Sequence, residues 1–212
     1  QTLAAISTGG FSNYDNSLEA FTVIQQSAIM LVSTLGAISL ILYYKGVKKS
    51  PTAFFGDFEF TAFALFCVIS TIALTVAGML LDGLSFGGSL VRMPLMAFSA
   101  QSTTGFAVTD TGALSSGSKL VIIISMAMGG MIGSTAGGIK IFRVLVFLRI
   151  LHLMLARTSM PKQAVVTPRL HDTELGPEES RNAILLIVLF MLFTLASWLP
   201  FLAMKYDAID SL

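Results

Sequence analysis

Four apolar stretches of this chain are each long enough to cross a lipid bilayer as a helix. A bilayer with a hydrocarbon core of roughly 30 Å needs about 20 apolar residues per crossing. The stretches that reach this length run over residues 21–44, 60–81, 120–155 and 183–204. Charged residues make up 12% of the 212 residues, about half the share in a typical soluble domain. The sequence therefore predicts an all-α polytopic membrane protein.

A fifth apolar stretch, residues 89–101, is too short to cross the membrane. Its length suits a helix that enters the membrane and returns through a loop. Irregular backbone at membrane depth survives only where it faces protein or a water-filled path. We therefore predict a re-entrant pore helix here, followed by a loop at residues 102–106.

The loop at residues 102–106 repeats a phrase from the start of the chain. Residues 7–11 read STGGF and residues 102–106 read STTGF, and the same register aligns Ala5 with Ala100. Each copy leads out of a loop into a long apolar helix. An internal repeat of this kind makes the feature part of the architecture.

Turns of this composition are typical of an ion-conducting pore. Backbone carbonyl groups can replace the hydration shell of K⁺ where glycine permits unusual backbone angles, and the negative end of the preceding helix dipole favours a cation. Phe11 and Phe106 are expected to wedge the turns against neighbouring helices. The alternative is a pair of glycine turns without ion contact. The residues predicted to supply carbonyl groups are Thr8, Gly9, Gly10, Thr103, Thr104 and Gly105.

The third apolar stretch contains a run of glycines. Five of the ten residues 129–138 are glycine, and each costs about 1 kcal/mol of helix propensity relative to alanine. The segment is therefore predicted to unwind, with Ser134 and Thr135 facing the water path. Lys140 provides a cation at the inner end of this break.

Two other interpretations of the glycine run are weaker. Gly129, Gly133 and Gly137 are spaced four residues apart, which would also permit close packing of helices. Residues 133–138 have the spacing of a phosphate-binding loop, but Ile139 stands where that loop needs a lysine. Paired glycines at both ends of the run favour a mobile loop over packing.

The placement of lysine and arginine predicts the orientation. These residues concentrate just after the first apolar stretch and over residues 157–181, and cytoplasmic loops are enriched in them. Both repeated phrases then face outward. The polar segment 161–179 is either a solvated loop or long enough to bind another molecule. The formal net charge of +1 argues against a nucleic-acid partner.

These motifs resemble the Trk/Ktr/HKT superfamily of potassium transporters, and most closely the bacterial Trk-type pore subunit. The resemblance is carried by ISTGGFS at residues 6–12, QSTTGF at 101–106 and GGMIGSTAGGIKIFR at 129–143. It implies four helix–pore loop–helix repeats in one chain, arranged with pseudo-fourfold symmetry as in K⁺ channels. The present sequence would be an interior fragment: the end of repeat two (1–49), repeat three (50–156), a cytoplasmic linker (157–181) and the first helix of repeat four (182–212).

The resemblance also implies roles. The two turns would be two walls of a K⁺ selectivity filter, although Gly9 departs from the threonine at the matching position of the second copy. The glycine run would gate the path below the filter; its residues are Gly129, Gly130, Gly133, Ser134, Thr135, Gly137, Gly138 and Lys140. The protein would be a homodimer in the bacterial inner membrane, embedded in lipid. It would bind a cytoplasmic nucleotide-binding regulatory subunit, with residues 45–57 and 157–181 as candidate contacts.

Two other classes of function fit less well. A substrate-coupled secondary transporter with glycine-broken helices is the main alternative, but it would need intramembrane charges. Lys140 is the one charge in the interior of a span, because Arg143 and Arg149 lie in the tail of the third stretch. An enzyme is not expected, because His152 and His171 have no matching ligand or nucleophile array and Cys67 is most simply an apolar filler. K⁺ is expected as the transported ion, with no cofactor.

Overall fold

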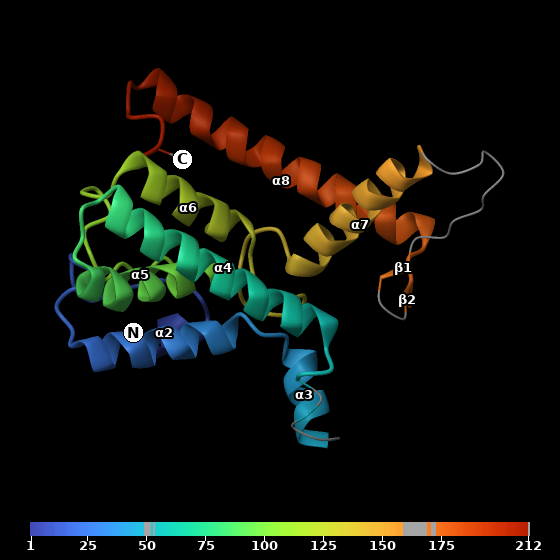
Figure 1. Cartoon of the computed structure of the whole chain (residues 1–212), viewed down its shortest axis with the longest axis horizontal. Helices are drawn as coiled ribbons and strands as arrows, with labels where there is room; N and C mark the ends of the chain where they lie inside the picture. Colours follow the sequence, from blue (N-terminus) through green and yellow to red (C-terminus); the bar gives the residue numbers. More distant parts are fainter. Residues whose placement is uncertain (49–51, 53, 159–168, 171–172, 212) are drawn as a thin grey trace.

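The computed structural model describes residues 1–48, 52, 54–158, 169–170 and 173–211 (Figure 1). Within these residues the regular secondary structure is helical, apart from a short hairpin in which β1 (Arg169–Leu170) pairs antiparallel with β2 (Thr173–Glu174) and an isolated bridge between Met128 and Ile139. The helices are α1 (Thr2–Ile6), α2 (Val23–Gly36), α3 (Leu40–Lys48), α4 (Phe58–Leu80), α5 (Phe86–Gln101), α6 (Ser116–Ala127), α7 (Ile141–Arg157) and α8 (Pro177–Ala203).

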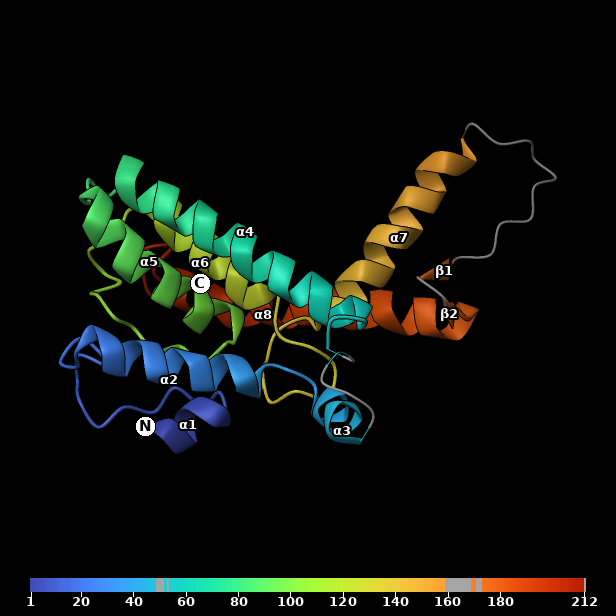
Figure 2. The ribbon, with the colours of Figure 1, turned by 60° about the horizontal axis from the view of Figure 1, so that its bottom comes forward.

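The helices form two groups. Helix α4 packs on α5 and α6, and α2 packs on α1 and α5; Figure 2 shows α1 and α2 together below the α4–α5–α6 group. Helix α7 packs on α8 at the far end (Figure 1). Buried apolar side chains from α1, α2, α4 and α5 form a core beside both repeated turns, and Met30, Leu74, Met93 and Phe106 are among its most enclosed members.

Three of the predicted helical segments are confirmed. Helices α4 and α8 are long and apolar enough to span a membrane, as predicted for residues 60–81 and 183–204. Helix α5 has 16 residues, about 24 Å at 1.5 Å per residue, and it ends at Gln101 as expected of a re-entrant pore helix. The side chains of Asp57 and Ser85 are the N-caps of α4 and α5, because they accept hydrogen bonds from backbone N–H groups in the first turn of each helix.

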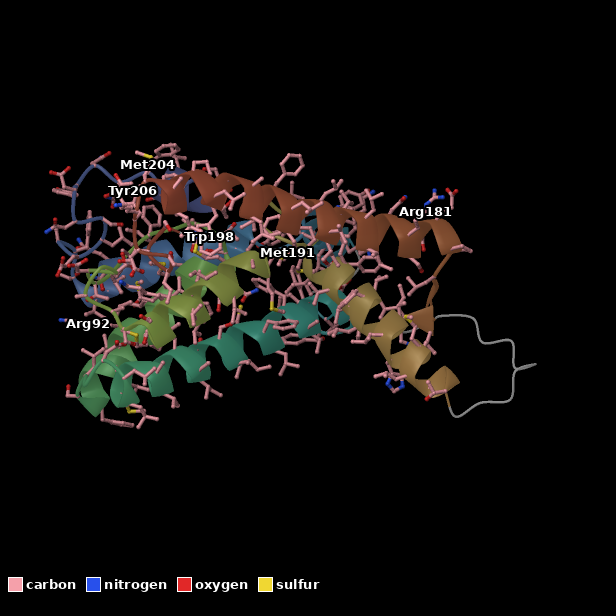
Figure 3. The ribbon with its side chains drawn as sticks, turned by 90° about the horizontal axis from the view of Figure 1, so that it is seen from above. Arg92, Arg181, Met191, Trp198, Met204 and Tyr206 are labelled. Carbon is pink, nitrogen blue, oxygen red and sulfur yellow. The ribbon has the colours of Figure 1, made fainter. Side chains whose placement is uncertain are left out.

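The surface of α8 is apolar along most of its length. Figure 3 shows Met191 and Trp198 along this helix, with Arg181 at one end and Met204 and Tyr206 at the other. Large side chains such as Phe193 are exposed, which suits a helix that faces lipid or further protein.

The first predicted span differs from expectation, because it is bent rather than straight. Helices α2 and α3 meet at an angle of 88° across residues 37–39. The glycine run causes this break by taking the hydrogen bonds of the next helical turn: the N–H of Thr135 donates to Gly36 O at 3.1 Å, and the N–H of Met131 donates to Ala37 O at 3.0 Å. Carbonyl groups at the end of α2 are thus satisfied by another segment.

The predicted break in the third span is confirmed. Helix α6 ends at Ala127 and α7 begins at Ile141, so residues 128–140 form a non-helical segment inside an otherwise apolar helix pair. We call residues 128–140 the glycine loop.

Candidate functional site

The two repeated turns have the same backbone structure. The N–H of Thr8 donates to Ala5 O at 3.0 Å, and the N–H of Thr103 donates to Ala100 O at 2.9 Å. Each turn therefore follows the end of a helix, α1 or α5, in the same way. The sequence repeat is a structural repeat.

Both turns also use left-handed backbone angles at matching positions. The φ angle is +51° at Thr8 and +54° at Thr103, and it is +67° at Gly10 and +81° at Gly105. Positive φ is unusual for threonine, because its side chain is β-branched. Strain of this kind persists only where the surrounding structure imposes it, and it clusters at functional sites.

The carbonyl groups of these turns accept no hydrogen bond from the described part of the chain. Among the described residues, no N–H or O–H group donates to the backbone oxygen of any of the six predicted filter residues, Thr8, Gly9, Gly10, Thr103, Thr104 and Gly105. A carbonyl group without a donor away from water costs free energy. An array of such oxygens is therefore suited to a dehydrated cation.

The two turns lie side by side. The N–H of Leu18 donates to Ala107 O at 2.9 Å, and the N–H of Ala107 donates to Ser17 Oγ at 3.0 Å, so the segments that follow the turns are joined. A Cβ atom added at Gly10 would overlap the carbonyl oxygen of Thr104. Glycine is thus required where one turn meets its neighbour.

The expected wedging is seen for only one phenylalanine. Phe106 is 1% exposed and packs in the core, whereas Phe11 is 80% exposed. The two residues occupy equivalent positions, but no described segment covers Phe11 as α2 and its neighbours cover Phe106.

The glycine loop is closed at its neck by backbone pairing. The N–H of Gly129 donates to Ile139 O at 3.0 Å, and the N–H of Ile139 donates to Ala127 O at 2.8 Å. A Cβ atom at Gly129 would overlap the Gly137 carbonyl oxygen, so glycine serves here for close approach of two backbone segments. None of Gly129, Gly133 and Gly137 lies in a helix, and packing of helices through these glycines is not the arrangement found.

The glycine loop is hydrogen-bonded to both turns. Thr8 Oγ1 donates to Thr135 O at 2.9 Å, and the N–H of Gly137 donates to Thr103 Oγ1 at 2.6 Å. Thr135 Oγ1 also donates to Ile6 O at 3.0 Å, at the end of α1. Segments that were predicted separately from sequence therefore form one connected unit.

Lys140 folds back onto the loop that it follows. Its ammonium group donates to Ser134 O at 3.4 Å, to Ser134 Oγ at 3.3 Å and to Ala136 O. A positive charge thus lies against carbonyl groups of the glycine loop. Ser134 and Thr135 make hydrogen bonds within the protein and stabilise the loop in this form.

Sequence reasoning missed two polar residues that contact the loop. Gln101 is 1% exposed, and its Nε2 donates to Met128 O at 2.6 Å, where the loop begins. Its Oε1 accepts from Ser70 Oγ at 3.4 Å. Glu59, in the first turn of α4, accepts from the N–H of Ile132 at 2.7 Å. The amide of Gln101 in an otherwise apolar pore helix could have been identified from the sequence. Glu59 could not, because glutamate is common in the first turn of a helix.

The chain offers no second kind of site in its described part. Cys67 is buried and His152 is exposed on α7, while His171 lies outside the described residues. No group of three or more His, Cys, Asp or Glu side chains that would hold a metal ion occurs among the residues that the structure describes.

Equivalent turns after a short helix and a re-entrant helix, set among apolar spans, define a pore-loop membrane protein. The particular family follows from comparison: the chain belongs to the TrkH family of cation transport proteins, whose family model matches residues 1–212. The prediction that it is not an enzyme is confirmed by this membership.

Individual relatives cover the same region. The chain is 33% identical over 213 residues to the uncharacterized cation transporter MJ1485 of Methanocaldococcus jannaschii, covering 100% of this chain and 42% of the relative. It is 27% identical to the Trk system potassium uptake protein TrkI of Halomonas elongata (90% and 39% covered) and 24% identical to TrkG of Escherichia coli K12 (99% and 43%).

The fold matches a solved structure, the crystal structure of the potassium transporter TrkH from Vibrio parahaemolyticus. The TM-score is 0.87 at 21% identity, over 98% of this chain and 45% of that protein. The predicted pore-loop helical fold is therefore confirmed. The chain spans less than half the length of each of these relatives.

Proposed function

We propose that this chain forms half of the wall of a potassium-uptake pore, with the two turns as part of the selectivity filter and the glycine loop as its gate. The observation that carries the proposal is the pair of equivalent turns whose carbonyl groups have no donor among the described residues. Relatives named as potassium uptake proteins support K⁺ as the transported ion. No covalent chemistry is required of the chain.

Exposed positions at Gly105 and Phe11 support a filter in which further pore loops surround the same path. Gly10 lies against the Thr104 carbonyl group, whereas Gly105, its equivalent, has nothing within 4 Å of an added Cβ. At the other edge, Phe11 is exposed although Phe106 is buried. Both edges suit contact with equivalent repeats in the rest of the protein, with repeat three over residues 50–156 and repeat four beginning near residue 182.

The contacts of the glycine loop support its role as the gate. The loop is held by Thr8 and Thr103, the first residues of the two turns with positive φ. Lys140 adds a positive charge that opposes the entry of another cation. Conduction then requires the loop to leave the turns and the Lys140 ammonium group to move away from the path.

The proposed pore has a defined orientation in the membrane and a cytoplasmic partner. Lysine and arginine placement supports outward-facing turns in a bacterial inner membrane. The relatives' designation as parts of a "Trk system" supports a regulatory partner, for which we propose a cytoplasmic nucleotide-binding ring that contacts residues 45–57 and 157–181, and a homodimeric pore. Residues 49–51, 53, 159–168 and 171–172 of these segments lie outside the described residues.

A flux measurement with matched glycine variants tests the filter. We expect Gly105→Ser in the full-length protein to weaken the preference for K⁺ over Na⁺ in liposomes, because serine is strained at a φ of +81°. Gly87→Ser is the control, since Gly87 is exposed on α5 and has open space around it. An unchanged flux ratio in Gly105→Ser would contradict the filter assignment. Flux that needs a Na⁺ or proton gradient would favour the coupled transporter instead.

A further inference from the structure

One carboxylate holds the tip of the glycine loop. Glu59 is half-buried, and its Oε1 accepts the N–H of Ile132 at 2.7 Å. Among the described residues, Glu59 is the only acidic side chain that hydrogen-bonds to residues 128–140. Hydrogen bonds to an ionised carboxylate are roughly twice as strong as neutral ones. This contact therefore restrains the tip more than a neutral hydrogen bond would.

Ile132 occupies a tight turn at this tip. The N–H of Ser134 donates to Met131 O at 3.2 Å, and Gly133 has a φ of +73°, which is the pattern of a type II turn with Ile132 at its second position. The carbonyl group of Gly133 also accepts the N–H of Leu40 at 3.1 Å. The tip thus lies between the start of α4 and the break that separates α2 from α3.

Glu59 is itself held in place by the start of α4. Asp57, the N-cap, accepts the N–H groups of Glu59 at 3.0 Å and Phe60 at 3.1 Å. The backbone amide of Phe142, in the first turn of α7, lies near the same carboxylate, and a negative charge is favourable at a helix N-terminus. The Phe54 ring packs on that of Phe60 at 5.8 Å between centroids, so the segment before α4 is packed against the helix.

We propose that Glu59 is a positioning residue for the gate: it holds the glycine loop closed from the start of α4, while Thr8 and Thr103 hold it from the filter turns. This role rests on the proposed function, because it needs the loop to be a gate. A displacement of the segment that precedes α4 would be passed to the loop through Asp57 and Glu59. Release of the Ile132 N–H would then favour the open state.

Variants on both sides of the hydrogen bond test this role in the full-length protein. Glu59→Ala removes the acceptor, and we expect basal K⁺ flux into liposomes to rise about tenfold. Glu59→Gln keeps an acceptor without the charge and should raise flux by roughly threefold. Ile132→Pro removes the donor and leaves Glu59 in place, because proline lacks an N–H and is common at the second position of a type II turn. It should raise flux as much as Glu59→Ala.

A combined variant and a control complete the experiment. Glu59→Ala with Ile132→Pro should conduct no more than either single variant, because both remove the same interaction. The K⁺ to Na⁺ ratio should stay at the wild-type value, since the filter turns are untouched. Glu19→Ala, which removes an exposed carboxylate from the segment between α1 and α2, should conduct like the wild type.

The outcomes separate this inference from the proposed function. Deletion of residues 133–137 removes the middle of the loop and tests the gate without altering Glu59. If the deletion raises flux while Glu59→Ala and Ile132→Pro do not, the gate proposal stands and the role of Glu59 is overturned. If none of the three raises flux, the gate proposal itself fails, and the role of Glu59 fails with it.

Discussion

A single added methyl group at Gly10 should disturb the filter, whereas the same change at Gly9 should not. Gly10 has a φ of +67°, and its Cβ would lie inside the 3.0 Å that real Cβ atoms keep from the Thr104 carbonyl oxygen. Gly9 has no contact closer than 3.3 Å, and the equivalent position in the second copy carries Thr104. The sequence repeat therefore supplies its own matched control.

The size of the effect follows from the two costs at Gly10. A left-handed conformation costs an L-residue other than glycine roughly 1–2 kcal/mol. To relieve the overlap, the Thr104 oxygen must move by roughly 1 Å, a large displacement for a filter whose oxygens replace a hydration shell. We expect Gly10→Ala to lower the K⁺ to Na⁺ preference at least about tenfold, and Gly9→Ala to change it less than about twofold, corresponding to about 1.4 and 0.4 kcal/mol.

The assay is a competition between ions in liposomes that contain the full-length variants. K⁺ flux is measured in the presence of increasing Na⁺, after size-exclusion chromatography has established that each variant is folded. Equal selectivity in Gly10→Ala and the wild type would refute the assignment of Thr104 as a filter wall beside Gly10. A larger loss for Gly9→Ala than for Gly10→Ala would refute the equivalence of the two turns.

Three further perturbations probe the loop and its supports. Lys140→Gln should raise basal flux about tenfold or more in the same assay, because it removes a positive charge from the loop carbonyl groups; unchanged flux would place the ammonium group outside the path. Gln101→Leu should lower the unfolding temperature in detergent by several degrees, since it leaves the Met128 carbonyl group without its donor; Leu90→Ala, at an exposed site on α5, is the control. Asp82→Asn should also lower the unfolding temperature, because the folded protein stabilises the ionised Asp82 carboxylate. Burial raises the pKa of Asp82, but hydrogen bonds from Ser118 and Ser115 outweigh burial and hold the pKa below its usual value. The advantage of the wild type over Asp82→Asn should therefore persist at neutral pH, where the carboxylate is ionised in both folded and unfolded protein, and shrink below about pH 4 as the pH falls through the folded pKa; a constant difference down to pH 3 would contradict this.

Local patterns in the sequence sufficed for much of the helical structure. Uninterrupted apolar runs of the right length predict α4 and α8. A single segment that crosses a bilayer must satisfy its backbone N–H and C=O groups by its own hydrogen bonds, and a helix does this. The glycine run predicts the break between α6 and α7, since its helix propensity is poor over many consecutive residues. The repeated phrase predicts equivalent turns, and the matching φ angles at Thr8 and Thr103 bear this out.

Contacts between distant segments were beyond the reach of these patterns. Residues 21–44 carry no charge and predict one span. Helix α2 nevertheless ends at Gly36, where the backbone N–H groups of Thr135 and Met131 donate to the carbonyl groups of Gly36 and Ala37. The contact of Glu59 with Ile132 and the exposure of Phe11 likewise depend on which segments become neighbours.

The sequence by itself determined where the long apolar helices α4 and α8 lie, where the third apolar stretch unwinds and which short phrase occurs twice, because apolar length, helix propensity and repetition are properties of consecutive residues. The tertiary structure alone decided that the glycine loop is hydrogen-bonded to both turns and to the end of α2. The physical reason is that an unwound segment must find partners for its backbone groups wherever the fold offers them, and those partners are set by packing rather than by neighbouring residues in the chain.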